Sequence, residues 1–373
     1  MTVAVHGVGT SHFGRQPGRT LTDLAWDAVR EALADAGTED VDAVWVGTVF
    51  GAPGVAQRVL HALGITDVPV VTVENACASG TTAFLEAHES VRTGRYRRVL
   101  ALGLEQMSTA FDGAITPEPT DAEGLSGLAM PALYAMAAHR YLETGAATLE
   151  QLAAVSVKNH AVAEHNDRAQ YAGRYTVEQV LASRMIADPL TLLQCCPTSD
   201  GAAAAVLAPA DGSPDEVLVR GLGFRSGSLW DHRSAHVWGY DLVAATAADA
   251  FAQAGTGPDD VDVFEVHDAF TVGEVATTEA LGIVPPGDGG AAAAAGVTAV
   301  GGARPVNPSG GLLSRGHPLG ATGLAQVAEV VWQLRGRAGG RQVEGARTGL
   351  VETMGGGVSG IDGNGCVVAV LAR

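Results

Sequence analysis

The chain has 373 residues, of which 47% are hydrophobic and 17% charged, so it is a globular protein long enough for two or three domains. Its formal net charge of −18 excludes a broad electrostatic attraction for nucleic acid or for an anionic membrane surface. No apolar stretch is long enough to span a bilayer, and Lys158, the only lysine, makes Schiff-base catalysis a poor default.

The first residues and the cysteines indicate the compartment. Residues 1–5 form a short strand-like run without the basic and apolar regions of an export signal. The cysteine spacing fits neither a disulfide framework nor a paired metal site, since the four are Cys77, Cys195, Cys196 and Cys366. We therefore expect a reducing, cytoplasmic location and no bound metal.

One helix-and-strand pattern occurs twice along the chain. Residues 21–37 have apolar positions at helical spacing and a terminal glycine, and residues 41–47 follow as a strand. Residues 242–255 and 261–267 repeat this order, with the same Ala-Gly helix end and the same Val-Asp entry into the strand. The repetition predicts two related α/β units.

A second, weaker correspondence supports the duplication. Residues 77–91 and 316–334 each read as a helix that starts in a run of small residues. Apolar strand-like runs follow both helices, at residues 98–104 and 348–352. The two halves therefore predict duplicated α/β domains with buried, mostly parallel sheets.

Residues 109–196 interrupt this alternation. They begin with a loop rich in Pro, Asp, Glu and Gly and continue as helices over residues 133–142 and from 149 to about 165. We interpret them as an insertion over the active site, and the alternative is a structural elaboration without ligand contact. Residues 285–304, rich in Gly and Ala, are expected to form a loop. The expected units are residues 1–108 plus 197–214, residues 109–196, and residues 215–373.

Cys77 is the first candidate for chemistry. The segment Val73-Glu74-Asn75-Ala76-Cys77-Ala78-Ser79-Gly80 ends a β-branched run and opens a helix. Unpaired N–H groups and the helix dipole at such a position favour the thiolate, the nucleophilic form of cysteine. The alternative, which we also assign to the other three cysteines, is a buried structural thiol.

His317 lies in a glycine-dense run before the second of these helices. Residues 307–323 read NPSGGLLSRGHPLGATG, which demands unusual backbone angles and close approach of the backbone to a ligand. Phosphate binding is the alternative for such a loop, but the Gly-Lys-Ser/Thr ending of a P-loop is missing.

Two further segments end strands of the second half. His267 closes the strand 261–267, at the position where α/β proteins place ligands, and the alternative is a solvent-facing histidine. Glu265 lies on the same face of that strand and receives no role. Residues 353–360, TMGGGVSG, follow a strand as a glycine loop that suits either an oxyanion hole or a tight turn.

In this order and spacing, the four segments resemble the thiolase family, and most of all the sterol-carrier-protein-type thiolases. His267-Asp268-Ala269-Phe270 and Gly316-His317-Pro318 match two motif blocks of that family. Residues 7–15 and 199–203 match its opening and the segment that closes its first half, so the likeness covers essentially the whole chain. The resemblance implies a five-layered αβαβα sandwich with two stacked sheets, an inserted loop domain, and a homodimer or tetramer.

The resemblance also implies roles for individual residues. Cys77 would take the acyl group, His317 would activate it, and His267 would help bind the thioester oxygen of the second substrate through a water. The substrate thioester would be carried by coenzyme A or acyl carrier protein, and no tightly bound cofactor is expected. The expected substrate-binding residues are Asn307, Ser309, Gly316, Met354, Gly355 and Gly356.

One position departs from the family pattern. Many thiolases have a second cysteine at the start of the C-terminal glycine loop as acid/base, and some sterol-carrier types place it after His-Asp. This chain has Thr353 at the first position and Ala269 at the second, and Cys366 lies too far along to replace either. A hydroxyl is a far weaker acid than a thiol, so ordinary reversible thiolysis is not expected.

The sequence therefore predicts an acyltransferase or condensing enzyme with an acyl-Cys77 intermediate and a carbon nucleophile as acceptor. One alternative is a thiolase-like carbon–carbon lyase that acts with a small zinc-bearing OB-fold partner, although such lyases are expected to lack the nucleophilic cysteine. Another alternative is a non-catalytic scaffold subunit, which the joint presence of Cys77, His267 and His317 disfavours.

Overall fold

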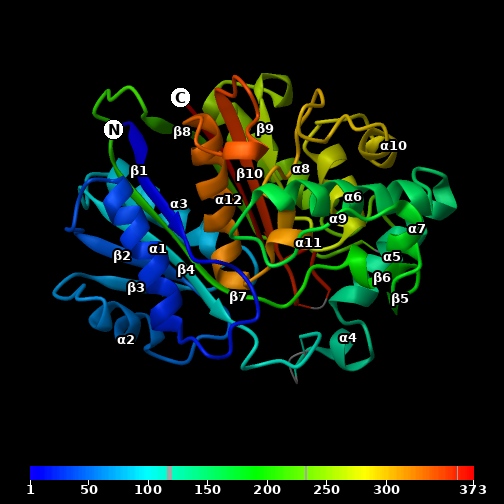
Figure 1. Ribbon diagram of the computed structural model, residues 1–373, viewed down its shortest axis with the longest axis horizontal. Helices are drawn as coiled ribbons and strands as arrows, with labels where there is room; N and C mark the ends of the chain where they lie inside the picture. The colour runs from blue at the N-terminus through cyan, green and yellow to red at the C-terminus, as the bar shows by residue number, and fades with distance from the viewer. Residues whose placement is uncertain (116–119, 232, 359) are drawn as a thin grey trace.

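Nine strands hydrogen-bond into one mixed sheet that crosses the molecule (Figure 1). The computed structural model describes residues 1–115, 120–231, 233–358 and 360–373, so Ser359 of the last glycine loop lies outside the described residues. Across the sheet the strands are β3 (Val70–Val73), β2 (Ala43–Gly47), β4 (Val99–Gln106), β7 (Asp200–Pro209), β1 (Val3–Thr10), β8 (Val217–Arg225), β11 (Gly365–Ala372), β10 (Thr348–Gly355) and β9 (Val263–Glu265). β1 and β8 pair through only two residue pairs, so the sheet divides there into two halves.

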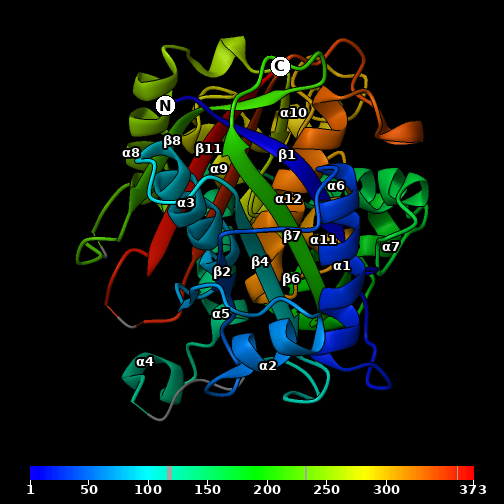
Figure 2. The same ribbon diagram turned by 90° about the vertical axis from the view of Figure 1, so that its left-hand side faces the viewer.

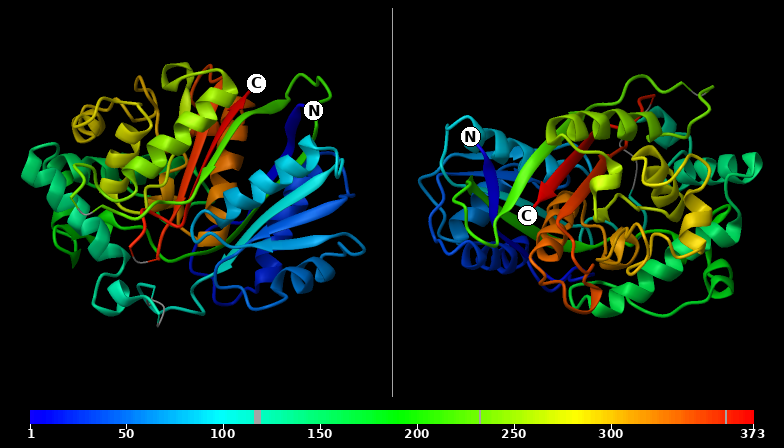
Figure 3. Two further views of the ribbon diagram at one scale, coloured as in Figure 1. Left: turned by 180° about the vertical axis from the view of Figure 1, so that it is seen from behind. Right: turned by 90° about the horizontal axis from the view of Figure 1, so that it is seen from above.

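Two helices fill the space between the half-sheets (Figure 3). α3 (Ser79–Arg92) and α12 (Leu319–Leu334) pack against each other, and α12 contacts strands of both halves. α12 is buried on nearly every side, as its apolar sequence requires. One hydrophobic core joins these helices to both half-sheets.

Further helices cover the outer faces of the sheet. α1 (Leu21–Asp35) and α2 (Val55–Ala62) form a second core with the N-terminal half (Figure 2). α8 (Tyr240–Ala254) forms a third core with the C-terminal half. The predicted α–β–α–β–α layering is confirmed, with the difference that the two β layers are joined through β1 and β8 rather than separate.

The prediction of mostly parallel sheets was wrong. Five of the eight neighbouring strand pairs in the large sheet are antiparallel and three are parallel. β7 runs antiparallel to both β4 and β1, and β11 returns beside β10. Hydrophobic periodicity indicates which residues of a strand are buried, but it does not indicate in which direction neighbouring strands run. It therefore could not predict the antiparallel pairs.

The repeated helix-and-strand unit is present in both halves. α1 begins with a capping box between Thr20 and Asp23, and the helix is followed by Gly37 with a φ of 62°. α8 ends at Gly255, whose φ of 68° is the left-handed conformation that glycine tolerates best. The second strand is shorter than predicted, since β9 stops at Glu265 and leaves His267 just beyond its C-terminal end.

The segment between β4 and β7 packs on the C-terminal half. Its elements are α4 (Ala122–Leu125), α5 (Met130–Thr144), α6 (Leu149–Val162), η1 (Ala163–His165), α7 (Val177–Leu181), β5 (Met185–Ala187), β6 (Leu190–Thr191) and η2 (Leu192–Gln194). α6 contacts α9 (Thr271–Ala280), α10 (Gly289–Ala294) and α11 (Gly311–Arg315), and a fourth hydrophobic core fills this contact. We propose that residues 109–196 form one inserted unit between the halves 1–108 plus 197–214 and 215–373.

The remaining elements include one correction. Residues 285–304, expected as a loop, contain α10, because small residues with high helix propensity pack this turn against α6. Two 3₁₀ turns, η3 (Pro258–Asp260) and η4 (Gly339–Arg341), complete the C-terminal half. None of the described helices combines the length and apolarity needed to cross a membrane.

Candidate active site

Cys77 lies in a tight loop between β3 and α3. Ala76 adopts a left-handed φ of 49°, and the Ser79 hydroxyl bonds the loop internally, donating to the Ala76 carbonyl at 2.6 Å and accepting from the Asn75 N–H at 2.9 Å. Only small side chains flank the cysteine on either side. The loop therefore presents Cys77 just ahead of the first turn of α3, close to the predicted position.

His317 is held against the Cys77 thiol. Its Nε2 lies 3.3 Å from Sγ, and its Nδ1 lies 2.7 Å from the hydroxyl of Thr322 one turn into α12. Because the Thr322 hydroxyl donates to the carbonyl of Pro318, it accepts a hydrogen bond from Nδ1–H. This fixes the tautomer in which Nε2 is unprotonated and accepts the thiol proton.

His267 completes a group of three. Its ring packs edge-on against His317 with 5.1 Å between ring centroids, and its backbone N–H donates to the carboxyl of Glu352 at 2.9 Å. Nδ1 of His267 has no hydrogen-bond partner among the described residues. The sulfur of Cys77 and one nitrogen of each histidine lie within 4.8 Å of one another. The three predicted catalytic side chains therefore converge from three segments far apart in the sequence.

The same three atoms are close enough together to share a metal ion. One thiolate with two imidazoles is a donor set that zinc accepts while keeping a position open. The 3.3 Å contact between Sγ and Nε2 is equally the geometry of a proton-transfer pair. The expectation that no metal is bound stays a prediction.

Burial sets the charge state of the pair. Burial raises the pKa of the Cys77 thiol to about 12. The backbone N–H groups of Gly356 and Cys77 lower this pKa in part, whereas the charges of Glu105 and Glu74 raise it further. Burial also lowers the pKa of His317 well below its usual value and that of His267 to about 3. Both shifts favour a neutral thiol and a neutral imidazole in the resting pair, so burial acts against the helix terminus, which favours the thiolate.

Gly355 and Gly356 lie against the Cys77 loop and against Cys77 itself. A Cβ at Gly355 would stand 2.1 Å from the carbonyl oxygen of Asn75, so only glycine lets β10 approach the Cys77 loop. The N–H of Gly356 favours negative charge on the sulfur of Cys77, as an oxyanion-hole donor would. The two glycines expected to contact substrate thus lie beside the nucleophile.

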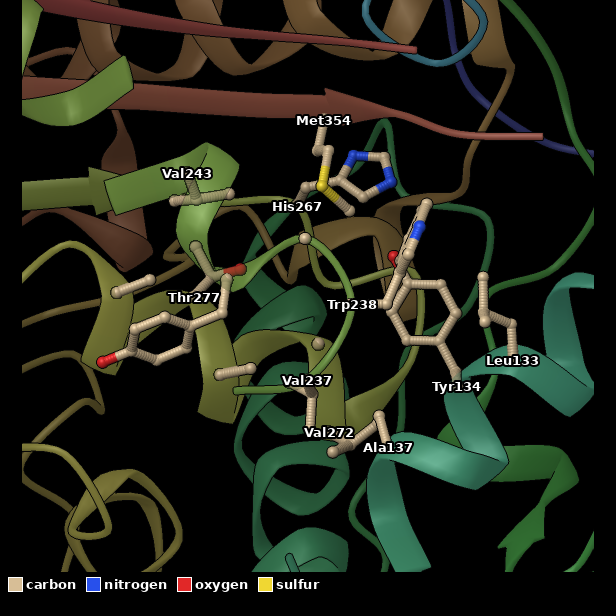
Figure 4. A pocket seen from close by; sticks show the side chains of 15 residues that line it. Leu133, Tyr134, Ala137, Val237, Trp238, Val243, His267, Val272, Thr277 and Met354 are labelled. Carbon is tan, nitrogen blue, oxygen red and sulfur yellow. The ribbon is translucent and has the colours of Figure 1, made fainter. Parts of the chain in front are cut away.

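The remaining predicted binding residues divide into two groups. Met354 lies beside His267 and lines a cavity (Figure 4), and Gly316 is required because a Cβ there would lie 2.6 Å from the Ser199 hydroxyl. Asn307 and Ser309 are fully buried, with their polar atoms bonded inside the protein. Both support the loops behind the histidines rather than face an open site.

A buried polar network fixes these loops from behind. Glu265, to which the sequence assigned no role, accepts hydrogen bonds from the Ser309 hydroxyl at 2.8 Å and from Arg315 at 3.2 Å. Asn307 accepts from the N–H of Val266 and donates to Glu274, each at 2.8 Å. Because every one of these groups is buried, the network holds the strand end that leads into His267 and the loop from Asn307 to Arg315 in one arrangement.

Sequence reasoning missed Tyr134 and Glu352. Tyr134 comes from α5 of the insertion and stacks on Phe270, with 4.5 Å between ring centroids. Burial raises its pKa well above the usual value, and the proximity of Cys77 and Glu352 adds to this. Burial likewise raises the pKa of Glu352 to about 7. Their sequence neighbourhoods carry no signal, since an isolated tyrosine in a helix and a glutamate in a strand are ordinary.

The other sulfur and hydroxyl groups have local partners. Cys195 bonds the Thr191 carbonyl at 3.3 Å, and Cys366 lies in β11 with its sulfur 3.8 Å from the Glu352 carboxyl. Thr353, which the family resemblance aligns with the second cysteine of many thiolases, donates its hydroxyl hydrogen to Gln326 of α12 at 2.6 Å. Burial raises the pKa of Cys196 and Cys366 well above the usual value, which agrees with structural thiols.

Comparisons with known proteins agree with this arrangement. The family profiles "Thiolase, N-terminal domain" and "Thiolase C-terminal domain-like" match residues 7–211 and 229–362. The chain is 43% identical to the acetyl-CoA acetyltransferase of Methanothermobacter thermautotrophicus, over 95% of this chain and 96% of that protein. It is 39% identical to human sterol carrier protein 2, over 95% of this chain and 70% of that protein.

Solved structures show the same fold. An Ltp2-ChsH2(DUF35) aldolase superposes with a TM-score of 0.86 at 26% identity, over 100% of this chain and 98% of that chain. Human mitochondrial 3-ketoacyl-CoA thiolase in complex with CoA superposes with a TM-score of 0.75 at 19% identity, over the same shares of the two chains. The fold, the matched profiles and the relatives together establish that the chain belongs to the thiolase family and is an acyltransferase of that superfamily.

Proposed function

We propose that the protein forms an acyl-Cys77 intermediate from an acyl thioester and transfers the acyl group to a carbon nucleophile. The observation that carries the proposal is the 3.3 Å contact between Sγ of Cys77 and the unprotonated Nε2 of His317. A neutral thiol becomes nucleophilic when this imidazole takes its proton during attack. The bond from Thr322 to Pro318 keeps Nε2 free for that proton.

Acylation follows from the geometry of the pair. Sγ attacks the thioester carbonyl carbon while its proton moves to Nε2, and the carbonyl oxygen gains negative charge. The N–H groups of Gly356 and Cys77, which already favour charge at the sulfur, are placed to bind that oxygen. Collapse of the tetrahedral adduct breaks the bond to the leaving thiol, which takes the proton from Nε2. Acyl-Cys77 and a free carrier thiol result.

In the second step the carbon nucleophile of the acceptor attacks the carbonyl carbon of acyl-Cys77. The carbon–carbon bond forms as the bond to Sγ breaks, and the Cys77 thiolate then takes up the proton that the acceptor carbon lost, or a proton from solvent if the acceptor formed its enolate by loss of carbon dioxide. His267 has a ring beside His317 and an Nδ1 without a partner among the described residues, which suits it to hold the acceptor thioester oxygen, directly or through a water. Coenzyme A is the carrier we propose, since two of the relatives are named as enzymes of coenzyme A thioesters.

A carbon–carbon lyase is the second candidate function. The similarity to an Ltp2-ChsH2(DUF35) aldolase favours it, and that title also names a second component. By analogy, a small zinc-bearing OB-fold protein would be the partner of this chain. The Cys77–His317 pair favours acyl transfer instead and argues equally against a scaffold role. Release of an aldehyde or ketone from an aldol-type thioester by the Cys77→Ala variant would support the lyase.

The two histidines are expected to act in different half-reactions. His317→Ala should slow acylation of Cys77 by about 10²–10³-fold, whereas His267→Ala should mainly slow transfer to the acceptor by a similar factor. Stopped-flow measurement of each half-reaction separates the two effects. Thr322→Val is the matched control, because it removes the partner of Nδ1 and should weaken acylation less than loss of the imidazole. A His267 variant that cannot be acylated, with His317→Ala acylated normally, would reverse the assignment.

We also propose that the protein is a cytoplasmic homodimer. Among the described residues, β3 lies at the edge of the nine-stranded sheet and pairs with β2 on one side only, and its residues Val70–Val73 are half-buried or exposed in the single chain. An unprotected β-branched edge strand pairs readily with another copy of itself. Light scattering at micromolar concentration should give twice the chain mass of 37.9 kDa.

Val71→Lys tests whether this edge is the interface, since it places a charge where the 40% exposed Val71 side chain lies. We expect the variant to be monomeric while it keeps the wild-type circular dichroism spectrum. Lysine at exposed Leu149, far along the chain in the insertion, is the control and should stay dimeric. A wild-type protein that is monomeric at 100 μM would contradict the proposal.

A further inference from the structure

The three candidate catalytic side chains also form a set of metal ligands. Among the described residues, Cys77, His267 and His317 are the one group of three histidine, cysteine or acidic side chains whose ligand atoms all lie within 4.8 Å of one another. Zn²⁺ accepts one thiolate and two imidazoles as ligands and leaves the fourth tetrahedral position to water. Acyl transfer uses the three groups in separate steps, whereas a metal ion would hold them all at once.

The distances fit zinc after a small movement of one ring. Bonds of about 2.3 Å to sulfur and about 2.0–2.1 Å to nitrogen place the ligand atoms of a tetrahedral site about 3.3–3.6 Å apart. Sγ of Cys77 and Nε2 of His317 already lie 3.3 Å apart. The nitrogen of His267 therefore has to approach by about 1.5 Å at most. Nδ1 of His267 has no hydrogen-bond partner among the described residues, so rotation of this ring breaks no bond of that atom.

The surroundings of His317 are those of a metal ligand. Its Nδ1–H donates to the Thr322 hydroxyl at 2.7 Å, so the lone pair of Nε2 faces the sulfur of Cys77. A zinc-bound histidine usually donates its other N–H to an oxygen, because that bond fixes the ring and raises the basicity of the ligating nitrogen. The bond that prepares Nε2 for the thiol proton therefore prepares it for a metal ion as well.

Access and charge also suit a cation. His267 and His317 are buried, whereas Cys77 is only half-buried, so solvent reaches part of the nucleophile residue. The formal net charge of −18 attracts cations to the molecule as a whole. Arg315, whose positive charge acts on His317, is paired with Glu265 at 3.2 Å. This pairing reduces the repulsion that Arg315 would exert on a divalent ion.

We propose that Cys77, His267 and His317 bind one Zn²⁺ ion reversibly and that the bound ion blocks acylation. The thiol loses its proton to solvent as the zinc–sulfur bond forms, and the two imidazoles bind as neutral donors. The ion then occupies both the attacking sulfur and its base, so a thioester cannot react until the ion leaves. Zinc is thus an inhibitor of acyl transfer and not its cofactor. The blocking rests on the proposed acyl-Cys77 intermediate, whereas the binding does not.

Cobalt tests the site without reference to activity, because a thiolate ligand gives Co²⁺ an intense near-ultraviolet absorption and a tetrahedral site gives it visible bands. The full-length protein, freed of metal with a chelator, should bind one Co²⁺ per chain, and Zn²⁺ should displace it. Cys77→Ala should lose the near-ultraviolet band. Cys196→Ala is the matched control and should keep the wild-type spectrum.

The histidine ligands are tested by the affinity for Zn²⁺, measured by competition with Co²⁺. Thr322→Val should weaken binding by about 10–100-fold, the usual effect of losing a bond that supports a ligand, and Thr322→Ser should restore it. His267→Ala, or His267→Gln if the alanine variant does not fold, should weaken binding at least about 100-fold, since it removes a ligand itself.

Inhibition is measured as the rate of acylation of Cys77 by acetyl-coenzyme A, with stopped-flow and intact mass. Zn²⁺ at a free concentration ten times its Kd should slow acylation about tenfold, because about one site in eleven then stays free. A chelator should restore the rate. Protein that already carries an acyl group on Cys77 should give no near-ultraviolet band with Co²⁺.

A near-ultraviolet band that survives in Cys77→Ala, or wild-type zinc affinity in the His267 variants, would overturn the site. Zinc binding that leaves the acylation rate unchanged would overturn the inhibition. Failure of the metal-free protein to become acylated, with the cobalt spectra as expected, would instead contradict the proposed function and support the metal site. The two failures are therefore distinguishable.

Discussion

Replacement of Cys77 with alanine is expected to abolish acylation completely. Wild-type protein mixed with an acyl thioester should gain the mass of one acyl group, and Cys77→Ala should gain none. Loss of a nucleophile that works with an adjacent base costs on the order of 10⁶-fold in rate, because neither residual binding nor the oxyanion donors can replace the attacking atom. Intact-protein mass spectrometry within one turnover time is the measurement.

The structure supplies a demanding control for this experiment. Cys196 is half-buried, as Cys77 is, and it is near enough to Cys77 that the charge of the Cys77 thiolate raises the pKa of Cys196. The Cys196→Ala variant should acylate at the wild-type rate, because the Cys77–His317 contact does not involve Cys196. Peptide mapping that finds the acyl group on Cys196 in the wild type would remove Cys77 as the nucleophile.

Short local patterns in the sequence were enough to select the three candidate catalytic side chains that lie together in the structure. Cys77 and His317 each precede a helix, and His267 follows a strand, so turn residues reveal all three. The repetition of the two halves and the family resemblance supplied the reason that these distant loops meet. The ends of α1 and α8 were predicted for the same reason, since an Ala-Gly stop with a left-handed glycine is a local signal.

Properties that depend on tertiary burial could not be predicted in this way. Desolvation raises the pKa of Cys77 and so acts against the helix terminus, which favours the thiolate. Asn307 and Ser309 have residue types suited to ligand contact, but their partners Glu274 and Glu265 come from other segments. The cavity beside His267 needs α5 of the insertion, and no pattern indicated which face of α5 meets the C-terminal half.

Thiolysis of acetoacetyl-coenzyme A and self-condensation of acetyl-coenzyme A are expected to be slower than acyl transfer to an activated acceptor by about 10²–10⁴-fold, the contribution of one general base. Deprotonation of an unactivated acetyl thioester needs a base beside the bound substrate. The family resemblance aligns Thr353 with that base, and the Thr353 hydroxyl hydrogen is donated to Gln326. An acceptor that loses carbon dioxide to form its enolate, or that is already nucleophilic, needs no such base.

Strand geometry makes Thr353→Cys an informative substitution. Residues 353 and 355 point to the same face of β10, and at Gly355 that face abuts the Cys77 loop. A thiol at position 353 would therefore lie on the side of the nucleophile, and we expect it to raise the thiolysis rate. Cys366, by contrast, lies close to the Glu352 carboxyl, and its pKa is raised well above the usual value. It does not replace the missing base.

Glu352 is the residue best suited to act as the base in place of a second cysteine, which would contradict this expectation. Its carboxyl accepts the N–H of His267, and burial raises its pKa to about 7, close to the value that suits a general base at neutral pH. Both reactions should be assayed in one buffer with wild type, Thr353→Cys and Glu352→Gln. Rapid wild-type thiolysis that survives substitution of His267 would show that another base exists and that the threonine is not limiting. Loss of that activity in Glu352→Gln would then assign the base to the carboxylate on the opposite face of β10.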